Sequence, residues 1–213
     1  MSLGRLFDPV HYRRMWDERY RSADYLFGKE PSAFALRAAA LLPARAELLC
    51  LGDGEGRNSV YLAGLGHRVT AMDLSEVALA KARTLAAERG VAVELHHADV
   101  AQWDWSRPFD AVLGIFIQFA PPALRREIHA GIARAVRPGG LVLLHGYAPR
   151  QVGYGTGGPS AAENMYELAD LAADFPGWER LVARDADEEI HEGRAHAGLS
   201  ALVDFVARKP LSA

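Results

Sequence analysis

The feature that most constrains the fold is an apolar run that ends in three glycines at alternate positions. Residues 46–58 read AELLCLGDGEGRN, and the glycines are Gly52, Gly54 and Gly56. The run is too short and too continuous for an amphipathic helix, so it predicts a buried strand. The glycines predict a tight loop that leads into a helix. Free backbone N–H groups at such a junction bind polar ligand groups.

Segments with strand and helix periodicity alternate after this loop. Strands are predicted at residues 46–52, 67–73, 92–99, 109–119 and 141–148, with helices between most of them. This alternation predicts a parallel sheet with helices on both faces. Two further strand-like segments, 178–191 and 198–209, are joined by only six residues, EGRAHA. Because this connection is too short for a crossover, we expect the two segments to pair antiparallel. The predicted fold class is α/β, a Rossmann-like doubly wound sheet of seven strands, five parallel plus a C-terminal antiparallel hairpin.

The chain of 213 residues is long enough for one domain with a sizeable core. We expect a helical cap over residues 1–45, a ligand-binding core over 46–148, and a final part over 149–213. The final part is predicted to contain a glycine-rich lid loop, a helix over about 161–172 and the hairpin. The turn before the fifth strand is predicted from the residues RPGG, 137–140.

Composition excludes several classes of function. The net charge of −3 gives no electrostatic reason to expect nucleic acid or an anionic membrane as a partner. No apolar run approaches the roughly 18 residues of a membrane span, and the first residues do not read as a signal peptide. The single cysteine, Cys50, excludes an internal disulfide. Together these features predict a cytoplasmic protein.

The glycine loop discriminates between cofactors. A dinucleotide fingerprint, G-x-G-x-x-G, would need a glycine where Arg57 stands. Two carboxylates inside the loop, Asp53 and Glu55, would repel a pyrophosphate but would suit a ligand that carries an ammonium and a sulfonium. The loop therefore predicts S-adenosylmethionine (SAM), with S-adenosylhomocysteine (SAH) as its product, rather than NAD.

Two more acids stand at predicted strand ends. Asp73 ends the second strand, where a carboxylate accepts hydrogen bonds from ribose hydroxyls, although NAD domains place an acid there too. Asp99 ends the third strand, where it is placed to accept from the adenine amino group. The loop, both acids, the RPGG turn and the closing hairpin together point to SAM more strongly than the loop alone.

With these motifs the sequence resembles the class I SAM-dependent methyltransferases. In that family the first motif has an acid before the glycines, D-x-G-x-G-x-G, whereas Cys50 occupies that place here. The methionyl ammonium is then held by Asp53, Glu55 or a backbone carbonyl, and the sequence leaves all three open. The segments WDERYRSADYLFGKEPSAF, GEGRNSVYLA and GTGGP are similar to the small-molecule branch that includes tellurite-resistance and thiopurine methyltransferases.

The resemblance implies a SAM site and an acceptor side. Aromatic residues before the first strand, Trp16 and Tyr20 among them, are expected to cap the pocket, where aromatic faces attract a sulfonium. The implied cofactor-binding residues are Gly52, Asp53, Gly54, Glu55, Gly56, Asn58, Asp73, Leu74, Asp99, Val100, Ile115, Trp16 and Tyr20. Candidate catalytic residues on the acceptor side are His196, Glu192 and His145.

The loop after the fourth strand bears on the acceptor. It reads GIFIQFAPP and lacks the N/D-P-P-Y motif of methyltransferases that modify base amino groups, with Ile115, Phe116 and Gln118 as predicted pocket walls. We therefore expect a small-molecule acceptor, such as a thiol or a chalcogen oxyanion, and no nucleic acid. No metal is expected, because the histidines of HEGRAH are five residues apart rather than the four of a zinc helix.

Two other functions remain open at this stage. A SAM-binding protein without catalysis would fit the off-pattern Cys50 and Asp53. An NAD(P)-dependent oxidoreductase is disfavoured by the missing third glycine, by the loop carboxylates and by the lack of a second catalytic domain.

Overall fold

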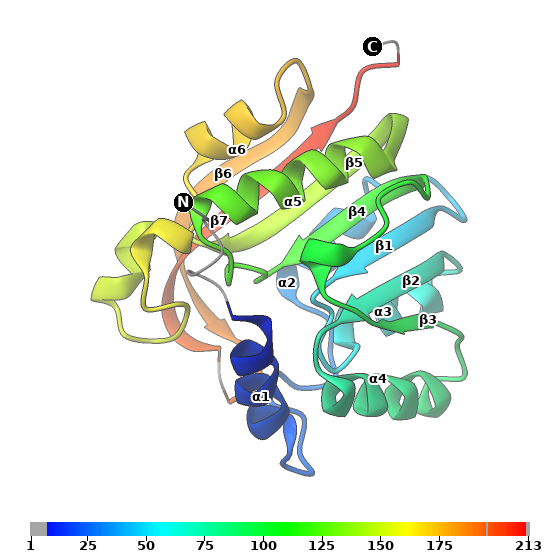
Figure 1. The fold of residues 1–213 in the computed structure, drawn as a ribbon, viewed down its shortest axis with the longest axis vertical. Coiled ribbons are helices and arrows are strands. Elements are labelled where there is room, and N and C mark those ends of the chain that lie inside the picture. Colours follow the sequence, from blue (N-terminus) through cyan, green and yellow to red (C-terminus); the bar gives the residue numbers. More distant parts are fainter. Residues whose placement is uncertain (1–7, 195, 212–213) are drawn as a thin grey trace.

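The computed structural model describes residues 8–194 and 196–211, and a seven-stranded sheet forms its centre (Figure 1). Along the sheet the strands follow the order β3-β2-β1-β4-β5-β7-β6. The first five pair in parallel, and β7 pairs antiparallel with both β5 and β6. This topology confirms the predicted Rossmann-like sheet with its C-terminal hairpin. The strands are β1 (Glu47–Leu51), β2 (Arg68–Asp73), β3 (Glu94–His97), β4 (Phe109–Ile115), β5 (Val136–Tyr147), β6 (Glu179–His191) and β7 (Ala197–Arg208).

Helices connect most of the strands, and side-chain caps mark several of their starts. Asp8, Ser32 and Ser75 each accept a backbone N–H of the helix that follows, which satisfies one of the free donors there. The helices are α1 (Pro9–Tyr20), α2 (Ala33–Ala39), α3 (Arg57–Gly64), α4 (Glu76–Glu88), α5 (Pro122–Ala135) and α6 (Leu168–Asp174). Short 3₁₀ turns are η1 (Val100–Gln102), η2 (Pro149–Gly153) and η3 (Ala162–Asn164).

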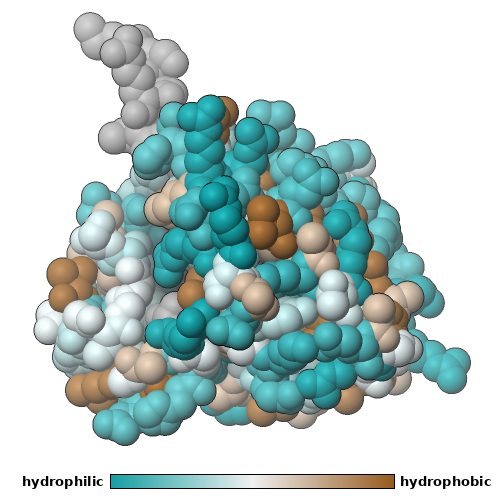
Figure 2. All heavy atoms as spheres, turned by 90° about the horizontal axis from the view of Figure 1, so that it is seen from below, coloured by the Kyte–Doolittle hydropathy of each residue, from teal (hydrophilic) through white to brown (hydrophobic). Residues whose placement is uncertain are grey.

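The sheet is buried between two layers of helices. Ile132 of α5 and Phe175, which directly follows α6, pack with Val112 on one face. Phe34 of α2 and Leu62 of α3 belong to the cluster on the other face. Helix α1 belongs to neither layer and lies beyond one end of the strands (Figure 1). On the face shown in Figure 2, hydrophobic residues form only small, separate groups among polar ones, as is normal for single exposed apolar side chains.

The fifth strand begins earlier than the sequence predicts. Residues 137–140, predicted as a turn, lie inside β5. The Gly139 N–H donates to the Lys209 carbonyl and the Lys209 N–H donates to the Gly140 carbonyl, so the segment is held beside the end of β7. The register between β4 and β5 shifts between Phe109 and Ala111, which accommodates the irregular start.

The helix predicted over about 161–172 is not one continuous helix. The chain forms η3, an extended link and then α6. Inside the link, the buried Tyr166 donates its N–H to the Tyr147 carbonyl. Arg125 donates to the Glu163 and Met165 carbonyls. Because these tertiary bonds use the backbone groups that a helix would need, the helix is interrupted.

The glycine-rich segment 149–161, predicted as a lid loop, lies beside β7. Gln151 is fully buried there, and its side-chain oxygen accepts the Ala201 N–H at 2.7 Å. None of its residues lines the pocket described below. Within the described residues, no helix is long and apolar enough to span a bilayer.

Candidate active site

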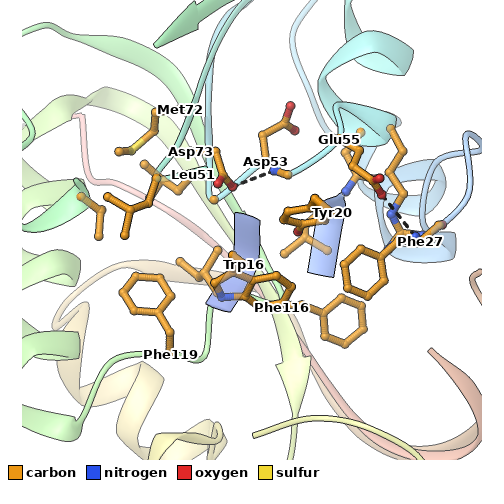
Figure 3. A pocket seen from close by; sticks show the side chains of 18 of the residues that line it. Trp16, Tyr20, Phe27, Leu51, Asp53, Glu55, Met72, Asp73, Phe116 and Phe119 are labelled. Carbon is orange, nitrogen blue, oxygen red and sulfur yellow. Dashed lines mark hydrogen bonds between the residues drawn. The ribbon is translucent and has the colours of Figure 1, made fainter. Parts of the chain in front are cut away.

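A pocket opens where β1, β2 and β4 end, beneath α1 (Figure 3). It holds about 1040 Å³ of empty space, solvent at its mouth included. Of the predicted cofactor-binding residues, all but Gly56 line it: Gly52, Asp53, Gly54, Glu55, Asn58, Asp73, Leu74, Asp99, Val100, Ile115, Trp16 and Tyr20.

The glycine loop forms the floor of the pocket and has a left-handed backbone conformation that residues with a side chain rarely adopt. Gly52, Gly54 and Gly56 have φ angles of 55°, 62° and 89°. A Cβ at Gly54 would lie 2.9 Å from the Tyr20 hydroxyl oxygen, and one at Gly56 would lie 2.8 Å from the Ala82 Cβ. Gly54 therefore gives α1 room to cover the loop, and Gly56 lets α3 and α4 approach each other.

Both loop carboxylates are already hydrogen bonded within the protein. Asp53 accepts from the Ser59 hydroxyl and from the Ser59 N–H, at the first turn of α3. Burial raises the pKa of Asp53 to about 7, although Ser59 donates to it. Glu55 is 3% exposed, pairs with Lys81 at 2.7 Å and accepts the Leu26 N–H at 2.8 Å. Glu55 therefore ties the segment after α1 to the loop.

Asp73 and Asp99 end the two strands beside the loop. Asp73 accepts the Gly54 N–H and the Ser75 N–H, both at 2.8 Å. Burial raises the pKa of Asp73 despite these bonds. Asp99 accepts the Ala101 N–H at 2.9 Å, which caps η1. Among the described residues, neither these two acids nor Asp53 forms a salt bridge, although all three line the pocket.

Aromatic rings form the opposite wall (Figure 3). The Trp16 and Tyr20 rings of α1 stack with centroids 5.2 Å apart, and Phe27 lies 6.3 Å from each. The Arg19 guanidinium lies over Trp16 at 4.4 Å. Helix α1 is anchored through the Asp17 carboxylate, which accepts the Ser75 hydroxyl at 2.6 Å. The cap predicted from the N-terminal aromatics thus lies over the pocket.

The three candidate catalytic residues occupy different places. His196 lines the pocket, with its ring between Phe27 and Phe116 at centroid distances of 4.4 and 4.2 Å. Glu192 does not line it; its carboxylate pairs with Arg57 at 2.7 Å and accepts the Ala33 N–H. His145 is not part of the lining either, because it is buried in the sheet.

His145 belongs to a polar pair behind the pocket wall. Its Nδ1 donates to Asp204 at 2.7 Å, and its ring stacks on Phe34 at 4.9 Å. Arg37 also donates to Asp204, at 2.7 Å. Both partners are 2% exposed, and the pair connects β5 and β7. Phe116, which lines the pocket, contacts the His145 ring at 4.7 Å.

Several lining residues were not singled out as binding residues from the sequence. Phe116 was expected as a wall and lines the pocket, whereas Gln118 bonds both backbone groups of Tyr147 instead. Phe119, Ile117 and Met72 also line it. Phe116 has a φ of +58°, a conformation that a bulky side chain adopts only under tertiary constraint. No sequence signal marks such a conformation at a phenylalanine.

The remaining expectations concern Cys50 and metals. Cys50 is 3% exposed and packs with α2, away from the pocket. Burial raises the pKa of its thiol well above the ordinary value. Within the described residues, no group of three or more His, Cys, Asp or Glu side chains could hold a metal ion.

Comparison with known proteins agrees with this geometry. Residues 48–140 match the sequence profile of the methyltransferase domain family. A trans-aconitate 2-methyltransferase from Paracidovorax citrulli is 36% identical over 99 residues, which are 46% of this chain and 33% of the relative. A protein-L-isoaspartate O-methyltransferase from Methylorubrum populi is 34% identical over 117 residues, 53% of this chain and 55% of the relative. The matches thus span between a third and just over half of these relatives.

Solved structures resemble the chain over nearly its whole length. One comes from work on the conversion of a disulfide bond into a thioacetal group during echinomycin biosynthesis. It has a TM-score of 0.78 and 20% sequence identity, and the match covers 95% of this chain and 94% of that one. The N-methyltransferase NodS from Bradyrhizobium japonicum, in complex with SAH, has a TM-score of 0.72 and 13% identity, with 93% and 98% covered. TehB from Haemophilus influenzae has a TM-score of 0.68 and 18% identity, with 92% and 66% covered. The chain therefore has an α/β methyltransferase fold.

Proposed function

We propose that this chain is a SAM-dependent methyltransferase that acts on a small-molecule acceptor. The observation that carries the proposal is the polarity of the pocket. Asp53, Asp73 and Asp99 line one side and, among the described residues, form no salt bridge, and aromatic rings line the other. This combination fits a ligand with an ammonium, a sulfonium, a ribose and an adenine. The methyltransferase domain match over residues 48–140 supports the same cofactor.

Each part of the cofactor has a matching group. Asp73 would accept from the ribose hydroxyls and Asp99 from the adenine amino group. The occupied carboxylates of Asp53 and Glu55 favour the third alternative for the ammonium, a backbone carbonyl. The cofactor supplies an activated methyl group, so the protein's contribution is to hold the acceptor in line with it and to exclude water. Trp16, Tyr20 and Phe27 would exclude water by covering the pocket.

The acceptor class follows from the wall around His196. Rings surround this end, and among the described residues no carboxylate there is free to act as a base, because Glu192 is paired with Arg57. A soft nucleophile that needs little base assistance fits best, as in the branch that contains tellurite-resistance and thiopurine methyltransferases. We therefore propose a thiol or a chalcogen oxyanion as the acceptor, rather than an amine or an alcohol.

The cofactor is tested by calorimetric titration with SAM, SAH and NADH in parallel. We expect SAM and SAH to bind and NADH not to bind. In Asp73→Asn the SAM affinity should fall about ten- to hundred-fold, because hydrogen bonds to a charged group contribute about 1.5–3 kcal/mol. Asp104→Asn is the matched control, since Asp104 is exposed and also accepts the N–H two residues ahead. Binding of NADH alone would refute the assignment of SAM as the cofactor.

A SAM-binding protein without catalysis remains the second candidate, because Cys50 stands where the family has an acid. Turnover separates the two. Release of SAH in the presence of thiols or chalcogen oxyanions supports the enzyme, whereas tight SAM binding without turnover on any acceptor supports a sensor.

A further inference from the structure

The Phe27 ring joins two parts of the wall at the acceptor end of the pocket. The residue lines the pocket, is half-buried and belongs to no helix or strand. Its ring centroid lies 6.3 Å from those of Trp16 and Tyr20 in α1, and 4.4 Å from that of His196, just before β7. The position of this one ring therefore determines how the cap and the hairpin meet over the acceptor space.

Two charged side chains next to the pocket floor hold the peptide groups of Phe27. Glu55 accepts the Phe27 N–H at 3.4 Å and the Leu26 N–H at 2.8 Å (Figure 3). Arg57 donates to the Phe27 carbonyl at 3.4 Å, and its guanidinium lies 5.9 Å from the centre of the Phe27 ring. The Leu26 carbonyl accepts the Arg194 N–H at 3.0 Å. Glu55 thus satisfies two consecutive N–H groups that lie outside any helix or sheet.

These contacts leave the Glu55 carboxylate little capacity for a ligand. Besides the two N–H groups it accepts the Lys81 ammonium at 2.7 Å, and Lys81 also donates to the Asp24 carbonyl at 2.8 Å. The residue is 3% exposed. A carboxylate has about four lone-pair sites, and three donors already surround this one. A ligand ammonium could bind Glu55 only by displacing Lys81 or the backbone before Gly28.

We propose that Glu55 is a positioning residue for the acceptor wall, which holds Phe27 against His196, and that it does not bind the methionyl ammonium of the cofactor. This assignment rests on the proposed function, which gives the wall an acceptor to contact. Hydrogen bonds to a charged group are stronger than those between neutral groups, so a carboxylate suits this task. Because Glu55 belongs to the glycine loop, the cofactor floor and the acceptor wall are joined at one side chain.

The imidazole of His196 supplies a spectroscopic readout. An aromatic ring 4.4 Å away shifts the NMR signals of the imidazole C–H protons by its ring current. The chain has eight histidines, and the signals of His196 are identified by their loss in His196→Asn. Burial, with Arg57, His145 and Arg19 nearby, lowers the pKa of His196 to about 3, so its signals should not titrate near neutral pH.

Three variants test the role of Glu55 in placing the ring. Phe27→Leu gives the imidazole signal without the neighbouring ring. Glu55→Gln should move the signal most of the way to this value, because one amide oxygen cannot serve Lys81 and two backbone N–H groups. Glu88→Gln is the matched control, since Glu88 also pairs with a lysine, Lys29, at 2.6 Å, but is exposed. It should leave the signal in place. An unchanged signal in Glu55→Gln would overturn the proposal.

A measurement on the wild type does not depend on how a variant folds. The Leu26 N–H should exchange with solvent about ten- to hundred-fold more slowly than an amide without an acceptor, because it is bonded to a charged group. Hydrogen exchange followed by NMR measures this rate. Exchange of the Leu26 amide at the rate of an unbonded amide would show that Glu55 does not hold the segment, and would overturn the proposal.

Calorimetry with SAH separates positioning of the wall from binding of the cofactor. Glu55→Gln should bind SAH as tightly as Phe27→Leu does, because both changes act only through the ring. A larger loss in Glu55→Gln, with the other histidine signals intact, would make Glu55 a ligand of the cofactor and overturn the assignment. Failure of the wild type to bind SAH would instead refute the proposed function, and the imidazole signal would still report where Phe27 lies.

Discussion

At the scale of single residues, Asp53 shows how a loop carboxylate can be structural. Its oxygens accept from Ser59 at the start of α3, where the free N–H groups and the helix dipole favour a negative charge. Burial opposes the charge and dominates, which raises its pKa to about 7. The sequence shows that an acid stands in the loop. It does not show that the acid turns toward α3, because this depends on the φ angles of the flanking glycines.

We predict that this acid makes stability fall as the pH rises. Because its pKa is about 7 when folded and about 3.9 when unfolded, the folded chain binds more protons between these values. Below pH 4 Asp53 is protonated in both states and does not affect the free energy of unfolding. Between pH 4 and pH 7 it lowers this free energy progressively, and above pH 7 the loss reaches about a few kcal/mol. Urea unfolding from pH 4 to 8 should show a shallower decline for Asp53→Asn than for wild type. Parallel curves would show that Asp53 keeps an ordinary pKa.

At the scale of elements, Gly56 joins α3 to α4. Its φ is +89°, and a Cβ would meet the Cα and Cβ of Ala82 at 2.9 and 2.8 Å. Gly66 has a similar φ of +91° but open space around it. In both alanine variants the left-handed backbone conformation should lower the free energy of unfolding by about 1–2 kcal/mol. Gly56→Ala should lose a further 1–3 kcal/mol or so from overpacking, measured as the free energy of unfolding. Equal losses would mean that α4 shifts to make room.

The strands and the closing hairpin were predictable because their signals are local and repeated. Each buried strand is an apolar run, and the short EGRAHA link permits only a hairpin. The prediction of one continuous helix over 161–172 was wrong, because Arg125 and Tyr147 form hydrogen bonds with backbone groups of this segment. Those partners are distant in sequence, so helical periodicity alone could not exclude them.

The same distinction separates the two halves of the pocket. The cofactor side comes from one motif and two strand ends, and the sequence predicted Gly52, Asp73 and Asp99 as lining residues. The acceptor side is assembled from segments far apart in the chain. Phe27 and His196 meet there only because the backbone before Gly28 packs against the hairpin tip, where a Cβ on Gly193 would lie 2.5 Å from the Leu26 carbonyl oxygen.

At the scale of the whole molecule, a buried ion pair connects the hairpin tip to the core. Arg57 and Glu192 are both largely buried and 2.7 Å apart, and they are 135 residues apart in the chain. Glu192 also accepts the Ala33 N–H before α2. One side chain therefore joins the N-terminal cap, the glycine loop region and the C-terminal hairpin.

We predict that Glu192→Gln is strongly destabilising. Removing one partner of a buried pair leaves a buried charge without compensation and costs about 3–5 kcal/mol. The exposed pair of Arg208 and Glu179 is the control, where Glu179→Gln should cost less than about 1 kcal/mol. Urea unfolding of both variants measures the difference. Similar small losses would show that solvent reaches Arg57 in the folded protein.

The separate origins of the two walls have an evolutionary consequence. The floor that would hold the cofactor comes from consecutive strand ends between residues 51 and 100, whose backbone conformations tolerate few substitutions. The opposite wall is formed by α1, the segment around Phe27 and the hairpin tip, which are far apart in the chain. Substitutions in these segments can reshape the acceptor space while the floor stays intact. A lineage built on this scaffold can therefore acquire new substrates by exchanging a few rings and keep the same methyl donor.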